Sequence, residues 1–295
     1  MQAELARTQD ETSELLKQQR KLARDSENVS DETYSEAKRL LSLFGVPYIE
    51  APTEAEAQCA QLEQANLVDG VVTEDNDALL FGARHVYRHL FDPQHHVEVY
   101  HMGDVEGEVN VDRDALIGLA QLLGSDYTDG VHGVGIVNAM ETIASFGSSL
   151  GGLQRFARWV RRWRGEDGAG AADGDDASDD EADDKAERRR AFERRHTTVR
   201  RNWVLPEDFP SRAVHEAYLR PVVDSSEVPL TWARPNLHAL REFCADKFGW
   251  TQSKADEVLL PMMSEVDRGV TQTSLHAHFS WDNQKFARVG SARLA

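Results

Sequence analysis

Two groups of acidic side chains in the first half of the chain have the types and the spacing of a metal site. Glu54 and Glu56 stand at the start of an expected helix, and Asp75 and Asp77 belong to the stretch 73–77, which directly follows the apolar residues Val71 and Val72. The carboxyl ends of strands in an open α/β sheet are where such folds place their chemistry. The like charges within residues 74–77 repel one another, and a divalent cation removes that penalty.

A fifth carboxylate, Asp126, follows a helix that we expect to end at Leu123. Together the five acids form a candidate site of oxygen ligands without a His or Cys ligand pattern, and hard oxygen ligands select Mg²⁺ or Mn²⁺. Two such ions about 4 Å apart suit the in-line attack of water on a phosphodiester. The acids therefore indicate a hydrolase that uses two metal ions.

Each group of acids, taken alone, also has a purely structural interpretation. Thr53 and Glu56 have the spacing of a capping box, and acids in the first turn complement the helix dipole. Residues 73–77 could equally be a solvated turn. Both alternatives stay open at this stage.

A glycine-spaced turn follows Asp126. Gly133, Val134, Gly135 and Ile136 lead into a further expected helix. Such a turn offers free backbone N–H groups and the positive end of the helix dipole to a phosphate. A lone Gly-x-Gly is weak evidence, and a tight helix–turn–helix is the alternative. Combined with the acids, the turn favours a nuclease over a phosphatase.

The elements that must position these residues alternate in the first half of the chain, and the second half is mostly helical. We expect helices over residues 34–44, 52–67, 112–123, 136–146, 150–164, 237–248 and 252–266, and strands over 46–49, 68–73, 85–90 and 96–101. Asp112 is the expected N-cap of its helix. The proline-containing stretch 206–235 is expected to be irregular. Strands that alternate with helices predict an α/β sheet.

The charge of the chain is uneven. Its 33 Lys+Arg and 51 Asp+Glu give a net charge of −18, which taken alone argues against a nucleic-acid binder. Ten of the acids lie in residues 166–184, which contain no basic and no large apolar residue. We expect this acidic insert to be disordered. Because arginine-rich stretches flank it, the insert is either a solvated linker or a tethered mimic of DNA.

Several motifs, in their order along the chain, resemble the flap endonuclease and xeroderma pigmentosum group G family of structure-specific DNA endonucleases. They are residues 43–60, 73–77, 80–88, 123–130 and 133–135. Residues 81–88, 216–224 and 241–250 resemble the group G branch in particular. The resemblance covers about residues 35–280, apart from the acidic insert.

The resemblance implies a PIN-like (resolvase-like) α/β nuclease core with a mostly parallel sheet, then a helix–two-turn–helix DNA-binding segment and C-terminal helices. It implies that Glu54 and Glu56 surround one Mg²⁺ and that Asp75, Asp77 and Asp126 surround a second, with Mn²⁺ able to substitute. The expected reaction is incision of DNA 5′ flaps or bubble junctions at the boundary of single-stranded and double-stranded DNA. The expected setting is nucleotide excision repair in the nucleus.

The resemblance also implies partners. The turn from Gly133 to Ile136 would hold duplex DNA, with K⁺ bound beside it. Gln272, Leu275, His278 and Phe279 approximate a sliding-clamp-binding peptide, although His278 replaces an aromatic residue, and an ordinary tail helix is the alternative. We expect a monomer that binds junction DNA, the clamp and repair factors, and no membrane.

These expectations divide the chain into six parts. They are a spacer end (1–30), the internal nuclease core (31–130), the helix–two-turn–helix segment (131–165), the acidic insert with a basic helix (166–200), a C-terminal helical part packing on the core (201–266) and the tail (267–295).

The chain departs from the family in one respect. The family's N-terminal nuclease region supplies the first strand, two more metal-binding aspartates, and a Lys and an Arg near the scissile phosphate, and nothing in residues 1–34 resembles it. We therefore expect a fragment with little or no nuclease activity of its own. Strong Mg²⁺-dependent bubble cleavage that Asp75→Ala abolishes would contradict this. The alternative functions are a non-catalytic half that binds DNA or repair factors, and a metal phosphoesterase acting on RNA.

Overall fold

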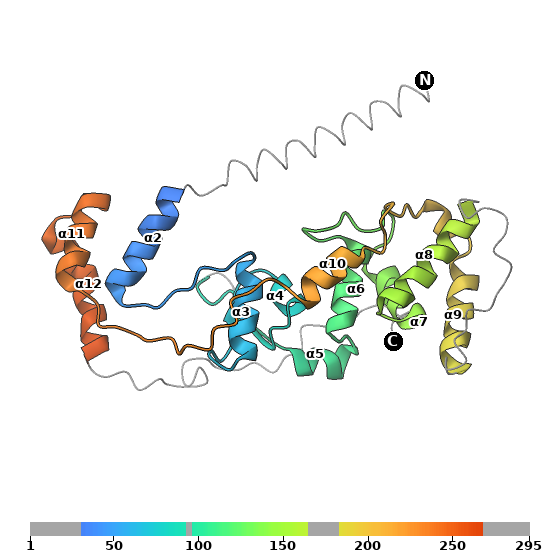
Figure 1. Cartoon of the computed structure of the whole chain (residues 1–295), viewed down its shortest axis with the longest axis horizontal. Helices are drawn as coiled ribbons and strands as arrows, with labels where there is room; N and C mark the ends of the chain where they lie inside the picture. The colour runs from blue at the N-terminus through green and yellow to red at the C-terminus, as the bar shows by residue number, and fades with distance from the viewer. Residues whose placement is uncertain (1–30, 93–95, 165–182, 268–295) are drawn as a thin grey trace, which may run out of the picture. The chain divides into compact units, whose positions relative to one another are not determined.

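The computed structural model describes residues 31–92, 96–164 and 183–267 (Figure 1). The described residues form two compact units, one of residues 31–49 and 230–267 and the other of residues 50–229. The spacer end, nearly all of the acidic insert and the tail with Gln272, Leu275, His278 and Phe279 lie outside them. What we expect of those segments stays a prediction.

The smaller unit consists of three helices: α2 (Asp31–Phe44), α11 (Leu237–Phe248) and α12 (Gln252–Asp267). Leu40, Leu43 and Phe44 of α2 pack against a buried cluster built from α11 and α12. Helix α2, which we expected in the nuclease core 31–130, therefore belongs to this smaller unit. The physical reason is that the apolar face of α2 is buried against α11 and α12.

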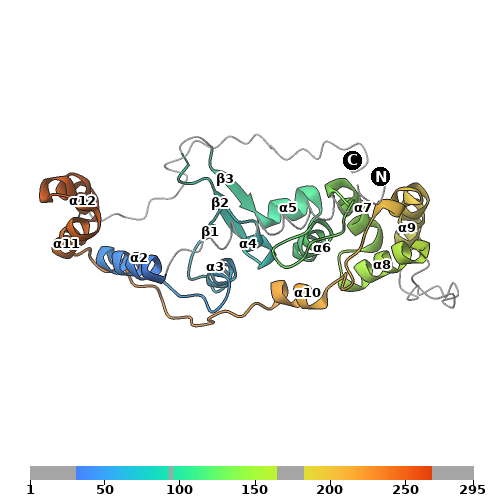
Figure 2. The same ribbon diagram turned by 90° about the horizontal axis from the view of Figure 1, so that it is seen from above.

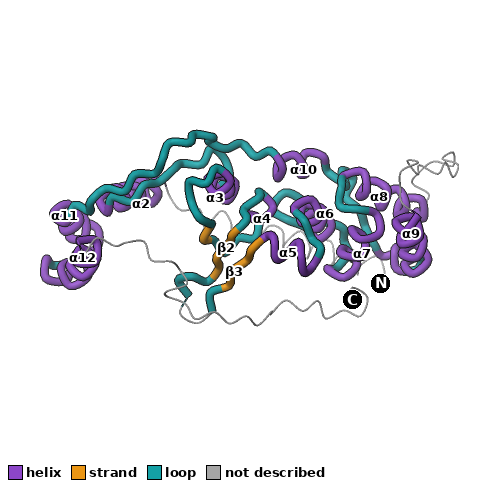
Figure 3. The backbone as a smooth tube through the Cα atoms, turned by 90° about the horizontal axis from the view of Figure 1, so that it is seen from below, coloured by secondary structure: helices purple, strands orange, loops and turns teal. Residues whose placement is uncertain are grey.

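A short mixed sheet lies in the larger unit (Figures 2 and 3). Its strands, in spatial order, are β1 (Val71–Val72), β2 (His85–Arg88) and β3 (Glu98–His101). β1 and β2 run parallel, whereas β2 and β3 run antiparallel. The connection from β2 to β3 is too short for the crossover that a parallel pair requires. The described strands thus make one parallel and one antiparallel pair, and residues 46–49, expected as a strand, are not in one.

Four helices pack on this sheet: α3 (Ala55–Gln64), α4 (Asp77–Leu80), α6 (Arg113–Leu123) and α10 (Arg212–Leu219). We did not predict α10, which lies in the stretch expected to be irregular. Val214 and Tyr218, four residues apart, are buried in the core next to the sheet, and this burial stabilises the helix. Pro210 and Pro221 lie just outside its ends, where prolines interrupt no helix.

Three further helices form an aromatic core at one end of the larger unit (Figure 1). They are α7 (Ile136–Phe146), α8 (Leu150–Arg164) and α9 (Asp183–His196), followed by the 3₁₀ turn η1 (Val199–Asn202). Phe146, Phe156, Trp159, Phe192 and Trp203 pack their rings together there. The core fixes α7, whose N-terminus carries the glycine turn.

Helices α7, α8 and α11 begin and end at the predicted residues, and the basic helix expected after the acidic insert is α9. Asp112 caps α6 as predicted, because its carboxylate accepts a hydrogen bond from Ala115 N at 2.7 Å. Besides α10, the helices α4 and α5 (Met102–Val109) were not predicted. None of the described helices is long and apolar enough to cross a membrane.

Candidate active site

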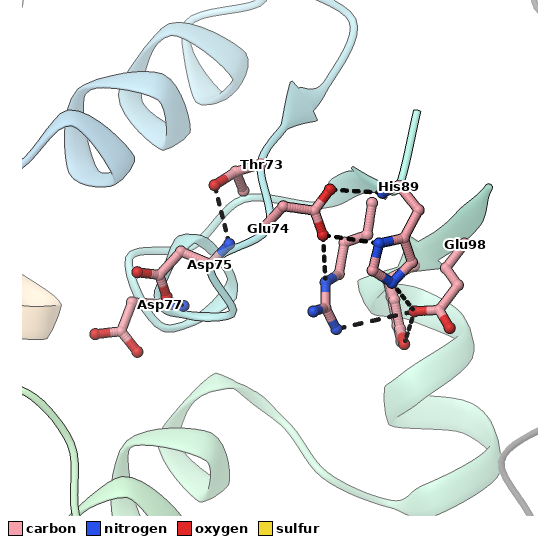
Figure 4. A network of polar contacts seen from close by, with 8 residues as sticks. Thr73, Glu74, Asp75, Asp77, His89 and Glu98 are labelled. Atoms are coloured by element: carbon pink, nitrogen blue, oxygen red, sulfur yellow. Dashed lines mark hydrogen bonds and ion pairs between the residues drawn. The ribbon is translucent and has the colours of Figure 1, made fainter. Parts of the chain in front are cut away.

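The turn after β1 directs two aspartates to the same side. Thr73 Oγ1 accepts a hydrogen bond from Asp75 N at 3.1 Å, and Asp75 Oδ1 accepts one from Asp77 N at 2.9 Å, where α4 begins (Figure 4). Asx-type bonds of this kind set the local backbone. Asp75 and Asp77 are thereby placed together at the carboxyl end of β1.

Glu74, between these residues, points the other way (Figure 4). Its carboxylate accepts a hydrogen bond from His89 N at 2.7 Å and lies 3.0 Å from His89 Nδ1 and 3.8 Å from Arg88 Nε. The solvated-turn interpretation therefore stays open for Glu74 and for the exposed Asp75, whereas Asp77 is half-buried. Glu74 is a matched control for any experiment on Asp75 or Asp77.

Glu54 and Glu56 open α3, but not as a capping box. The hydroxyl of Thr53 donates to Val222 O at 2.9 Å, and Glu54 is the N-cap residue without a side-chain capping bond. The capping-box alternative is therefore wrong, because the threonine is used in a contact with a distant segment. The Glu54 carboxylate instead accepts a hydrogen bond from Tyr127 Oη at 2.9 Å.

Asp126 lies in the loop between α6 and α7, next to Tyr127. The Tyr127 ring contacts the Tyr218 ring edge-on, with centroids 5.1 Å apart. Tyr218 in turn donates a hydrogen bond to Asp77 Oδ2 at 2.9 Å. The two tyrosines therefore connect the acids of α3, of the β1 turn and of the α6–α7 loop.

The electrostatics link the five acids through Asp77 and Tyr127. Burial raises the pKa of the Asp77 carboxyl, the hydrogen bond from Tyr218 lowers it, and the charges of Asp75, Asp126 and Glu56 raise it. Burial, the hydrogen bond to Glu54, and the charges of Glu54, Asp77 and Asp126 all raise the pKa of Tyr127. Each predicted acid thus influences Asp77 or Tyr127 at close range.

The chemistry of these donors suits a hard divalent cation. The like charges of Asp75, Asp126 and Glu56 raise the pKa of the Asp77 carboxyl, and a bound cation would remove this repulsion. Within the described ranges, however, no three His, Cys, Asp or Glu side chains are already arranged around a common metal position. Metal binding by these residues therefore remains a prediction.

The glycine turn is also in place before α7. Gly133 has φ +88°, and a Cβ there would lie 2.8 Å from Asn202 O. Gly135 is the N-cap of α7 without a side-chain capping bond, and a Cβ there would meet nothing within 4 Å. Val134 is buried whereas Ile136 is exposed. The turn therefore presents the first backbone N–H groups of α7 on an open surface.

Two arginines of the basic stretch that follows the acidic insert stack on aromatic rings of α8. Arg200 lies over the rings of Trp159 and Trp163, 4.6 and 5.2 Å from their centroids, and Arg201 lies 4.3 Å from that of Trp163. Stacking on aromatic rings holds guanidinium groups in fixed positions without neutralising them. The cations next to the acidic insert are thus partly ordered by the fold.

Tyr127 and Tyr218 are the site residues that the sequence analysis missed. Tyr127 directly follows Asp126, so its position next to a predicted ligand was an available signal. Tyr218 lies 141 residues from the carboxylate that it contacts, so no local spacing marked it, and its only signal was its place in the motif 216–224 of the resemblance.

Comparison with known proteins agrees with this geometry. The XPG I-region family matches residues 45–126. The chain is 40% identical over 278 residues to the DNA excision repair protein ERCC-5 homolog of Xenopus laevis, covering 94% of this chain and 22% of that protein. It is 38% identical to the catalytic core of Rad2 in complex with DNA substrate, with a TM-score of 0.63 over 83% of this chain and 73% of that one. The chain belongs to the flap endonuclease and XPG family.

A further member of this family is the Holliday junction-resolving enzyme GEN1, solved with product DNA, Mg²⁺ and Mn²⁺ ions. It is 29% identical, with a TM-score of 0.56 over 80% of this chain and 56% of that one. The nuclease-core fold of the family, predicted from the sequence, is therefore confirmed. This chain spans about a fifth of the length of its Xenopus relative.

Proposed function

We propose that the chain is the internal part of a structure-specific DNA endonuclease that incises 5′ flaps or bubble junctions by two-metal hydrolysis. The observation that carries the proposal is that two touching tyrosines donate hydrogen bonds to Glu54 and Asp77, while the charges of Asp75, Asp126 and Glu56 raise the pKa of Asp77. The relatives support it, since one is named as a DNA excision repair protein and another was solved on a DNA substrate.

In this proposal Glu54 and Glu56 hold one divalent cation, and Asp75, Asp77 and Asp126 hold the other. Mg²⁺ is the expected ion and Mn²⁺ its substitute. Bound there, such ions supply an activated water and stabilise the leaving oxygen of a phosphodiester. The chain's own contribution is to fix the carboxylates at the edge of the sheet.

Residues Gly133, Val134, Gly135 and Ile136 hold the DNA backbone in the same proposal. The open N-terminus of α7 suits a phosphate, and K⁺ beside the turn belongs to the proposal too. The arginines stacked on Trp159 and Trp163 add positive charge near the same helices. We further propose a nuclear setting in excision repair, with a sliding clamp and repair factors as additional partners.

The glycine turn yields a paired prediction. Gly135→Ala should leave the melting temperature unchanged, because its Cβ has open space and its φ is −97°. It should nevertheless weaken DNA binding several-fold, since the Cβ stands where a phosphate would approach. Gly133→Ala should lower stability by about 1–3 kcal/mol, because it combines φ +88° with a close contact. Thermal denaturation and fluorescence anisotropy with labelled flap DNA measure both effects. Equal DNA affinity of wild type and Gly135→Ala would contradict the proposal that this turn binds the DNA backbone.

The experiment for the function compares binding and incision of 5′-flap, bubble and plain duplex DNA of equal length. We expect tighter binding to the junctions. Mg²⁺-dependent incision at the junction, lost in Asp75→Ala and kept in Glu74→Gln, assigns catalysis to this chain. Junction binding without incision assigns the non-catalytic half. Equal binding to all three DNAs would contradict both functions.

A further inference from the structure

We infer that Tyr127 and Tyr218 are positioning residues. Tyr127 orients a carboxylate of one metal-binding group, and Tyr218 orients a carboxylate of the other. The inference rests on the proposed function, because it assigns a role relative to the two metal positions. Tyr127 bonds Glu54, which belongs to the first group, and Tyr218 bonds Asp77, which belongs to the second.

Both phenol groups are held by the fold rather than by the carboxylates. Tyr218 is fully buried, and its ring lies against Phe81 with centroids 5.2 Å apart. Tyr127 is 38% exposed, and its ring contacts that of Tyr218 edge-on. The hydroxyl groups therefore occupy positions set by α10 and by the α6–α7 loop before any ligand arrives.

A phenol is suited to orient a metal-binding carboxylate. It donates one hydrogen bond to one oxygen and leaves the remaining lone pairs free for a cation. It carries no positive charge, so it does not compete with the cation as an arginine or lysine would. Hydrogen-bonding groups behind metal ligands are worth 10-fold to 100-fold in metal affinity in other proteins.

The contact between the rings couples the two groups. Glu54 and Asp77 come from α3 and α4, and their bonded tyrosines touch each other. A displacement of α10 would therefore move the support of both carboxylates.

The test replaces only the hydroxyl groups. Tyr127→Phe and Tyr218→Phe keep the rings, and Tyr100→Phe is the matched control, because Tyr100 Oη donates to Glu98 at 2.9 Å in the polar network drawn in Figure 4. Mn²⁺ binding to the full chain is titrated by electron paramagnetic resonance and calorimetry. Each site variant should weaken one of two Mn²⁺ affinities about 10-fold and leave the other within twofold. Tyr100→Phe should change neither.

Two results would overturn the inference. One is that both site variants keep both Mn²⁺ affinities within twofold of wild type. The other is that they lose both affinities in parallel with the melting temperature of the metal-free chain, which is the signature of a merely structural bond. If Tyr218→Phe fails to fold, the half-exposed Tyr127→Phe decides alone. Failure of wild type to bind Mn²⁺ at all would instead refute the proposed two-metal function, on which this inference rests.

Discussion

Asp77→Asn is expected to make the metal-free protein more stable and to abolish its binding of a divalent cation. Asp77 is partly buried beside three other carboxylates, so its charge is costly in the folded state. Asparagine keeps the shape and can still accept the hydrogen bond from Tyr218, but it removes that charge. The same change removes a ligand from the proposed site, and the loss of metal binding should exceed 100-fold.

The pH dependence follows from the direction of the pKa shift. Because the pKa of Asp77 is raised in the folded state, the folded chain binds this proton more tightly than the unfolded chain does. The contribution of Asp77 to stability is therefore retained below the ordinary aspartate value of about 4 and lost as pH rises through the folded pKa. The advantage of Asp77→Asn in chelator should be largest near pH 8 and vanish near pH 4.

Thermal denaturation in chelator across this pH range provides the measurement. Glu74→Gln is the control, because Glu74 lies three residues earlier but is paired with His89 and Arg88. It should gain no stability and keep metal binding. A metal-free Asp77→Asn that melts below wild type at pH 8 would refute the described electrostatics.

The second large effect is expected at Glu141→Ala, at the contact of α7 with α9. Glu141 is buried, and its carboxylate oxygens lie 3.0 Å from Arg195 Nη1 and 3.0 Å from His196 Nε2. The contact with His196 is close but is not aligned as a hydrogen bond. His196 is itself buried and stacks on Phe192 with centroids 4.1 Å apart. Removing the carboxylate takes away the acceptor of Arg195 and leaves an empty space beside the buried His196 ring.

We expect Glu141→Ala to lower the free energy of unfolding of this helical end by about 3 kcal/mol. Removing one partner of a buried ion pair usually costs about 3–5 kcal/mol. We expect the lower end of that range, because the Arg195 side chain is half-exposed and water can solvate it. Since α7 carries the glycine turn, flap binding should fall as well. Hydrogen exchange of the α7 amides reports the local effect. The exposed Glu187→Ala on α9 should change stability by less than about 0.5 kcal/mol, and an equal effect of both variants would contradict the role of the buried carboxylate.

The candidate metal ligands were easier to predict from the sequence than the contacts that hold them in place. Asp75 and Asp77 were evident because acids directly follow an apolar strand, and α7 and α8 because apolar periodicity and glycines mark their ends. Thr53 was misinterpreted, because its local spacing matches a capping box while its hydroxyl bonds a residue 169 positions away. Long-range contacts of this kind leave no local pattern.

The same limit explains the other differences. Tyr218 and α10 were missed because the prolines around them suggested an irregular stretch, whereas burial of Val214 and Tyr218 in the core determines the helix. The sheet was expected to be mostly parallel, yet the length of the connection after β2 imposes an antiparallel pair. Helix α2 was assigned to the core because a pattern shows that a face is apolar, not which partner covers it.

The central claim is that the five carboxylates around Asp77 form a two-cation site. A Mn²⁺ titration followed by electron paramagnetic resonance tests it most directly, with wild type, Glu74→Gln, and a variant carrying both Asp75→Asn and Glu56→Gln. We predict two bound Mn²⁺ in wild type and in Glu74→Gln, both displaced by excess Mg²⁺, and none retained with comparable affinity in the double variant. Equal Mn²⁺ binding by the double variant and wild type, or no specific binding by wild type, would contradict the account.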